Sequence, residues 1–230
     1  MSFAEAELDA GRPLSPAVVA AFRRGADDRY SGLGELAGRM TEPVLDVGEQ
    51  WAETAMADVL PLRPAWRDLL SHAATARTAK PTATWKRKGG ALLDDIGPEA
   101  FRTRALPWLA LAGRPRTLTL RQDHREAPVN ELFDPFNANA LRGLAWLLAR
   151  TEPCEETATA LGALVDTALR VVPGHGPCNP KVANGAVYAL ARLTGPDARE
   201  ELLRLAERTA YKSTLRQIEA ALARTASQPQ

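Results

Sequence analysis

Apolar residues recur at intervals of three and four along most of the chain, the spacing that gathers them on one face of an α-helix. The pattern is most regular over residues 179–226. There it predicts three short amphipathic helices in succession, with a tight turn at Gly195-Pro196. A helix of this length cannot bury its apolar stripe alone. The three must therefore pack against one another, which is the principle of a helical-repeat protein.

Proline marks the expected start of several helices. Its missing N–H costs nothing in the first turn, because the amides there have no intrahelical acceptor. We expect helices to start at Ser15-Pro16, Gly97-Pro98, Asn179-Pro180 and Gly195-Pro196. Apolar stripes predict the other helices over about 44–60, 62–73, 81–96, 137–148 and 155–172. Pro107 should kink or split the helix that contains it, and Asn137 is a suitable N-cap.

Residues 113–136 interrupt the helical spacing. The alternation TLTL within them is too short to predict a sheet, so we expect a long irregular connection between two helical halves. The whole pattern predicts an all-α fold, a HEAT- or armadillo-like solenoid of short antiparallel helix pairs. Residues 1–61 are expected to form an N-terminal helical segment docked on a repeat domain at 62–226, with a disordered tail at 227–230.

Composition narrows the functional classes. The 230 residues carry a net charge of +1, which argues against a nucleic-acid binder driven by a charged tail. Within this balance, residues 1–62 sum to −6, residues 63–125 to +8 and residues 126–230 to −1. The basic middle either faces an acidic partner or phosphate, or neutralises the first third within one fold. We expect no membrane span and no secretory signal, and two cysteines suit a reduced cytoplasmic protein.

Two sets of polar and aromatic residues are the strongest candidates for a binding site. Each set recurs at i, i+3 and i+7, opposite the apolar stripe of its helix, and every second helix of a solenoid lines the same surface. Cation, amide and ring together suit an anionic or carbonyl-bearing ligand in a groove. The alternative is that the rings are partly buried and the polar groups cap adjacent turns. The residues are Asn139, Arg142, Trp146, Lys181, Asn184 and Tyr188.

His175, in the turn GHGP, joins this candidate groove. A histidine between glycines is exposed and titrates near neutrality, so it is a candidate base or ligand. The alternative, which we favour, is that the glycines serve the backbone of the turn and His175 bonds a neighbouring helix end. His72, His124, Cys154 and Cys178 show no metal-ligand spacing, and no phosphate loop or nucleophile motif is present. We therefore expect neither a metal nor a cofactor.

Three stretches carry a resemblance to a known family: the segment from Lys80-Pro81 to Trp85, the segment NALRGLAW, and GHGP with Lys181 and Asn184 after it. Over about residues 62–226 the chain resembles the helical-repeat region of large bacterial proteins that are described as molybdate-metabolism-regulator-like and are often linked to a WGR domain. The resemblance implies HEAT- or armadillo-like stacking and little biochemistry. The sequence departs from the longer proteins because it contains neither their large C-terminal domain nor the WGR module. Lys80 and Trp85 are secondary site candidates.

The expected function is therefore a helical-repeat module that binds a protein, a peptide or an anionic ligand along its groove. One alternative is a protein that acts on nucleic acid, similar to the HEAT-like DNA glycosylases, with Trp85 and Trp108 on a basic face. Another is a biosynthetic enzyme that uses Arg142, Lys181 and Asn184. If the groove holds a ligand, Arg142→Ala should abolish binding without unfolding the chain.

Overall fold

The computed structural model describes residues 3–26, 30–121 and 128–226. These residues form twelve helices and one short antiparallel hairpin, so the all-α prediction is confirmed. The helices are α1 (Phe3–Asp9), α2 (Pro16–Gly25), α3 (Gly34–Arg39), α4 (Gln50–Val59), α5 (Pro64–Ala73), α6 (Ala83–Ile96), α7 (Pro98–Ala110), α8 (Pro135–Leu148), α9 (Glu155–Leu169), α10 (Pro180–Leu190), α11 (Pro196–Arg208) and α12 (Lys212–Ala226). The strands are β1 (Val171–Val172) and β2 (Gly176–Pro177). None of the described helices is long and apolar enough to cross a membrane.

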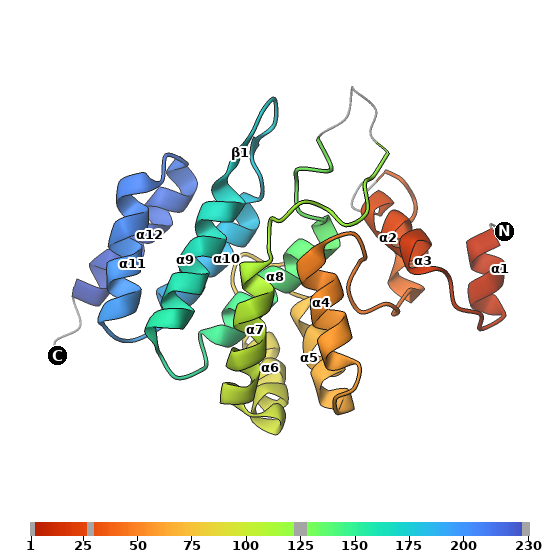
Figure 1. The fold of residues 1–230 in the computed structure, drawn as a ribbon, viewed down its shortest axis with the longest axis horizontal. Coiled ribbons are helices and arrows are strands. Elements are labelled where there is room, and N and C mark those ends of the chain that lie inside the picture. The colour runs from red at the N-terminus through yellow and green to blue at the C-terminus, as the bar shows by residue number, and fades with distance from the viewer. Residues whose placement is uncertain (1–2, 27–29, 122–127, 227–230) are drawn as a thin grey trace.

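The helices stand side by side along the longest axis of the molecule, broadly in the order of the sequence (Figure 1). α1 lies at one end and α11 and α12 lie at the other. α8 occupies the middle, where it packs against α5 on one side and α10 on the other, and residues 140–148 are all buried. α10 also packs against α9 and α12. The central helices therefore share one continuous core.

The predicted proline starts are confirmed. α2, α7, α10 and α11 each begin with proline. The Ser15 and Asn179 side chains accept hydrogen bonds from amides of the first turn, Val18 N at 3.4 Å and Val182 N at 3.1 Å. Gly195 precedes α11 with a φ of 112°, a left-handed conformation that glycine adopts without a steric penalty. The turns of this chain are therefore encoded locally.

Several predicted elements differ in the structure. The helix expected over 44–60 begins only at Gln50, because residues 44–49 form a buried loop with polar bonds to other parts of the chain. The N-cap of α8 is Asp134 rather than Asn137, whose own side chain is buried and bonded elsewhere. The turn GHGP closes the hairpin of β1 and β2. α7 continues through Pro107 without interruption.

The hydrophobic interior consists of two separate clusters. The main core runs from Val44 to Ala221 and includes α4, which the sequence assigned to the first 61 residues. A small second cluster of Ala4, Val19 and Met40 holds α1 to α3 together. The natural division of the fold therefore lies near residues 41–43. We call residues 3–40 the N-terminal unit and residues 44–226 the helical body.

Glycine lets α8 approach its neighbours closely. A Cβ built on Gly143 would lie 2.3 Å from the Ala73 carbonyl oxygen of α5. A Cβ on Gly185 of α10 would lie 2.5 Å from Arg142 Cγ. Both distances are well inside van der Waals contact, so only glycine fits at these two crossings.

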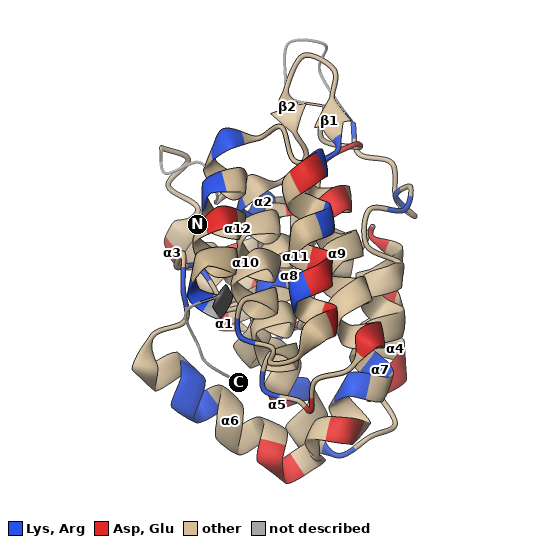
Figure 2. Cartoon of the chain, turned by 90° about the vertical axis from the view of Figure 1, so that its left-hand side faces the viewer, with Lys and Arg blue, Asp and Glu red and all other residues tan. Residues whose placement is uncertain are grey.

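Charges of both signs are spread over the C-terminal end of the molecule (Figure 2). α6 carries the exposed basic run 86–88 near one end and the acidic pair Asp94-Asp95 near the other. Asp95 pairs with Arg63 at 3.3 Å. Part of the positive charge of the predicted basic middle is thus offset within that same stretch of chain.

Candidate functional site

A cavity of about 290 Å³ lies at the seam between the N-terminal unit and the helical body. We call it the seam pocket. Its wall on the N-terminal side consists of small residues of α3, among them Ala37 and Gly38, together with Arg23 of α2. Its wall on the body side contains polar side chains of α8 and α10 and of the loop after α5. Those side chains are Asn139, Arg142, Lys181 and Arg77.

Arg142 is the buried centre of the body wall, with an exposed fraction of 5%. Its Nη2 donates to the Ala76 carbonyl oxygen and to Asn139 Oδ1, the latter at 2.8 Å. Its Nε is buried and donates to none of the described residues. No carboxylate in the described ranges bonds the side chain, and burial lowers the pKa of the Arg142 guanidinium from its ordinary value. The body wall of the pocket therefore contains a desolvated guanidinium that does not use all of its N–H donors within the described residues.

The other cations of the pocket fall into two kinds. Arg23 has a partner: its Nη1 donates to Asp46 Oδ1 at 2.8 Å, and its guanidinium carbon lies 4.1 Å from the centre of the Phe136 ring. Arg77 and Lys181 are exposed, and neither forms an ion pair with any other described residue. Three positive charges of the seam pocket thus lack a counter-charge among the residues that the structure describes.

The structure separates the residues that the sequence placed in one groove. Because α8 packs against α10, Asn139, Arg142 and Lys181 do line one pocket. Trp146 does not: its exposed fraction is 2%, and its ring meets those of Trp85 and Tyr188 edge-on at 5.1 and 6.1 Å. The proposed stacking role of Trp146 is therefore wrong, since a ligand cannot reach the face of a buried ring.

The remaining predicted residues serve the fold or lie elsewhere. Asn184 Oδ1 accepts a hydrogen bond from Thr214 Oγ1 of α12 at 2.7 Å. His175 is exposed in the hairpin turn and Lys80 is exposed before α6, and neither lines the seam pocket. Trp85 is half-buried, its indole nitrogen donating to Thr75 Oγ1 at 3.1 Å. These contacts agree better with the alternative interpretation, in which the polar groups bond within the fold, than with a continuous ligand-binding groove.

His72, Cys154 and Cys178 are also accounted for, whereas His124 lies outside the described residues. The His72 ring stacks on Trp85 with a centroid distance of 4.5 Å, and burial lowers its pKa, which favours the neutral form. Cys154 precedes α9, and the Cys178 amide bonds to the carbonyl oxygen of the residue after α9. The length of α9, about 22 Å for fifteen residues, separates them, so the two thiols cannot react with each other.

Trp108 does not offer a ring to a nucleic-acid base. It is fully buried, and its indole nitrogen donates to Asp58 Oδ2 at 2.8 Å. A glycosylase-like site needs an accessible ring beside its carboxylate, because the base must stack on it. Trp108 thus pairs with a carboxylate, but its ring lies within the core.

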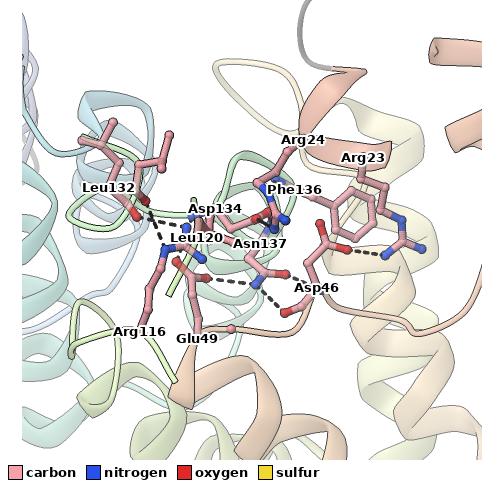
Figure 3. A network of polar contacts seen from close by, with 12 residues as sticks. Arg23, Arg24, Asp46, Glu49, Arg116, Leu120, Leu132, Asp134, Phe136 and Asn137 are labelled. Atoms are coloured by element: carbon pink, nitrogen blue, oxygen red, sulfur yellow. Dashed lines mark hydrogen bonds and ion pairs between the residues drawn. The ribbon is translucent and has the colours of Figure 1, made fainter. Parts of the chain in front are cut away.

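A buried polar network joins the N-terminal unit to the start of α8 (Figure 3). Asp46, Glu49, Asp134 and Asn137 are all nearly inaccessible to solvent. Asn137 Nδ2 donates to Glu49 Oε2 at 2.9 Å, and Asp134 Oδ2 pairs with Arg24 at 3.1 Å. The network therefore ties three distant segments of sequence together at one point.

Two carboxyl groups of this network have raised pKa values. Burial, reinforced by the charge of Asp134, raises the pKa of Asp46 to about 7 and that of Glu49 also to about 7. Arg23 opposes this shift at Asp46, but Asp46 Oδ2 accepts no hydrogen bond from the residues that the structure describes. Sequence reasoning missed all three acids because Asp46 and Glu49 fell inside an expected helix. The one local signal was the dipeptide Asp134-Pro135, a cap followed by proline.

A second cavity, of about 260 Å³, lies beside Glu49 and is lined by Arg114, Arg116 and Arg170. Two acidic residues, Glu49 and Glu131, line it as well and offset part of its positive charge. No three acidic, histidine or cysteine side chains of the described residues are grouped to hold a metal ion. The seam pocket is thus the more one-sided in charge of the two. In comparisons with family models, curated proteins and solved structures, nothing matches this chain.

Proposed function

We propose that this chain is a non-catalytic binding module that takes an anionic ligand in the seam pocket. The observation that carries the proposal is the set of Arg77, Arg142 and Lys181, three cations on one cavity wall that have no carboxylate partner among the described residues. Charge-assisted hydrogen bonds to an anion are stronger than those between neutral groups, and a guanidinium presents several donors at once. Of the protein, peptide and anion that the sequence allowed, this wall favours the anion.

The proposal includes a HEAT- or armadillo-like scaffold. Successive helices α4 and α5, α6 and α7, and α11 and α12 contact each other within pairs, and α9 contacts both α10 and α11. Such nearest-neighbour packing is how helical repeats bury their apolar faces. The resemblance to the repeat region of WGR-linked bacterial proteins and a cytoplasmic location belong to the same proposal. A protein partner along the exposed surface of these helices stays a prediction.

Calorimetric titration of the protein with sodium phosphate in low-salt buffer tests the proposal. We expect saturable binding that Lys181→Ala and Arg77→Ala each weaken about tenfold, the effect of losing one charge-assisted hydrogen bond. Lys80→Ala is the matched control, because Lys80 is an exposed lysine of a nearby loop outside the pocket. Absence of binding, or equal weakening by all three substitutions, contradicts the proposal.

Arg142→Ala is a poor test, contrary to the sequence-based expectation that it leaves the fold intact. The substitution removes the donor to the Ala76 carbonyl oxygen and empties the space beside Gly185. A buried carbonyl without a donor and a new cavity each destabilise a fold. We therefore expect Arg142→Ala to lower the melting temperature in a thermal scan, whereas Lys181→Ala should leave it unchanged.

A further inference from the structure

Resting on the proposed function, we infer that the ligand carries a doubly charged group of the phosphate type and that its binding holds the N-terminal unit against the helical body.

The charge of the pocket indicates a dianion. Arg77, Arg142 and Lys181 bring three positive charges, while Arg23 already pairs with Asp46. A single carboxylate would leave most of that charge uncompensated next to a buried guanidinium. A phosphate dianion offers its oxygens to several donors at once, among them the exposed side chains of Arg77 and Lys181. The volume of about 290 Å³ is near the lower end of small-molecule pockets, roughly 300 to 1,000 Å³, which favours a small phosphorylated molecule.

The two walls of the pocket belong to bodies with separate hydrophobic clusters. The N-terminal unit has its own small cluster, apart from the main core. Charged side chains provide much of the attachment between them: Arg23 to Asp46 and Arg24 to Asp134. Arg23 also lies over Phe136. An attachment of this kind is weaker than an apolar interface and opens more readily.

A ligand in the seam contacts both bodies only when they are docked. It therefore binds the docked state more tightly than the open one and shifts the population toward it. At a ligand concentration of about 100 times the dissociation constant, the open population should fall about 100-fold if the open state does not bind. Gly38 is the point where the N-terminal wall can be altered, since a Cβ built there meets nothing within 4 Å.

Hydrogen exchange of the full chain, with and without saturating sodium phosphate, tests the inference. Sodium acetate at equal ionic strength is the control. Phosphate should slow exchange at least tenfold in peptides from residues 16–26 and 30–40 and leave α9 unchanged, and Lys181→Ala should reduce the slowing about tenfold at the same phosphate concentration. Gly38→Leu, which adds a side chain to the N-terminal wall of the pocket, should weaken phosphate binding at least tenfold without lowering the melting temperature.

The outcomes separate this inference from the proposed function. If phosphate binds and Lys181→Ala weakens it, but the N-terminal unit exchanges equally fast with and without phosphate, the inference is overturned and the proposed function stands. If acetate or succinate binds more tightly than phosphate, the ligand class is wrong and the inference is overturned. If none of these anions binds, both the inference and the proposed function fail.

Discussion

Gly143→Ala is expected to lower the free energy of unfolding by about 2 to 3 kcal/mol, and Gly143→Val by more. The added Cβ would lie 2.3 Å from the Ala73 carbonyl oxygen and 2.6 Å from the Ala73 Cα, both backbone atoms of α5. A side chain can turn aside, but here a whole helix must move. Because α8 packs against α5, α6, α7 and α10, that movement disturbs contacts throughout the core.

Chemical denaturation of each variant measures this effect. Gly38→Ala is the control, as it replaces another helical glycine where the new methyl group meets open space. It should be neutral or stabilise by about 0.5 to 1 kcal/mol, because alanine has the higher helix propensity. An unchanged midpoint for Gly143→Ala would show that α5 and α8 are not in such close contact.

Raising the pH from 6.5 to 8 is expected to destabilise the fold by about 1.5 kcal/mol. Burial and the charge of Asp134 raise the native pKa of Asp46 and Glu49 to about 7, far above the ordinary value of such carboxyl groups. The native state therefore binds more protons than the unfolded state in this range, so its stability falls as the pH rises. Each carboxyl contributes about 0.8 kcal/mol between these two pH values.

Urea denaturation at several pH values checks the sign and size of this slope. His72 acts in the opposite direction, because burial lowers its native pKa and the unfolded state therefore binds more of this proton near pH 6.5. Its contribution, at most about 0.4 kcal/mol, is smaller than that of the two carboxyl groups. Asp134→Asn is the informative variant. It keeps an acceptor at the N-cap of α8 but removes the negative charge that helps to raise the pKa of Asp46 and Glu49. It should flatten the pH dependence, even if it lowers stability overall through loss of the pair with Arg24. A slope of the opposite sign would mean that both acids stay ionised in the native state.

Helical spacing predicted part of the candidate site correctly. Spacing placed Arg142 and Lys181 on helices that do meet, and both line the seam pocket. It could not show that Trp146 is covered by Trp85, because that contact depends on how α6 packs beside α8. Nor could it supply Arg23 and Arg77, which reach the pocket from other parts of the chain.

The sequence alone determined the helical class and most helix starts, because apolar period, capping side chains and proline act over a few residues. Ser15, Asn179 and Gly195 needed no distant partner to define their turns. Only the tertiary structure decided where the fold divides, which acids are buried together and which cations share a cavity. As a result, the Asp46 amide donates to Asn137, and Arg23 and Lys181 line the same cavity. Such pairings arise from the packing of whole helices, whose geometry no local pattern encodes.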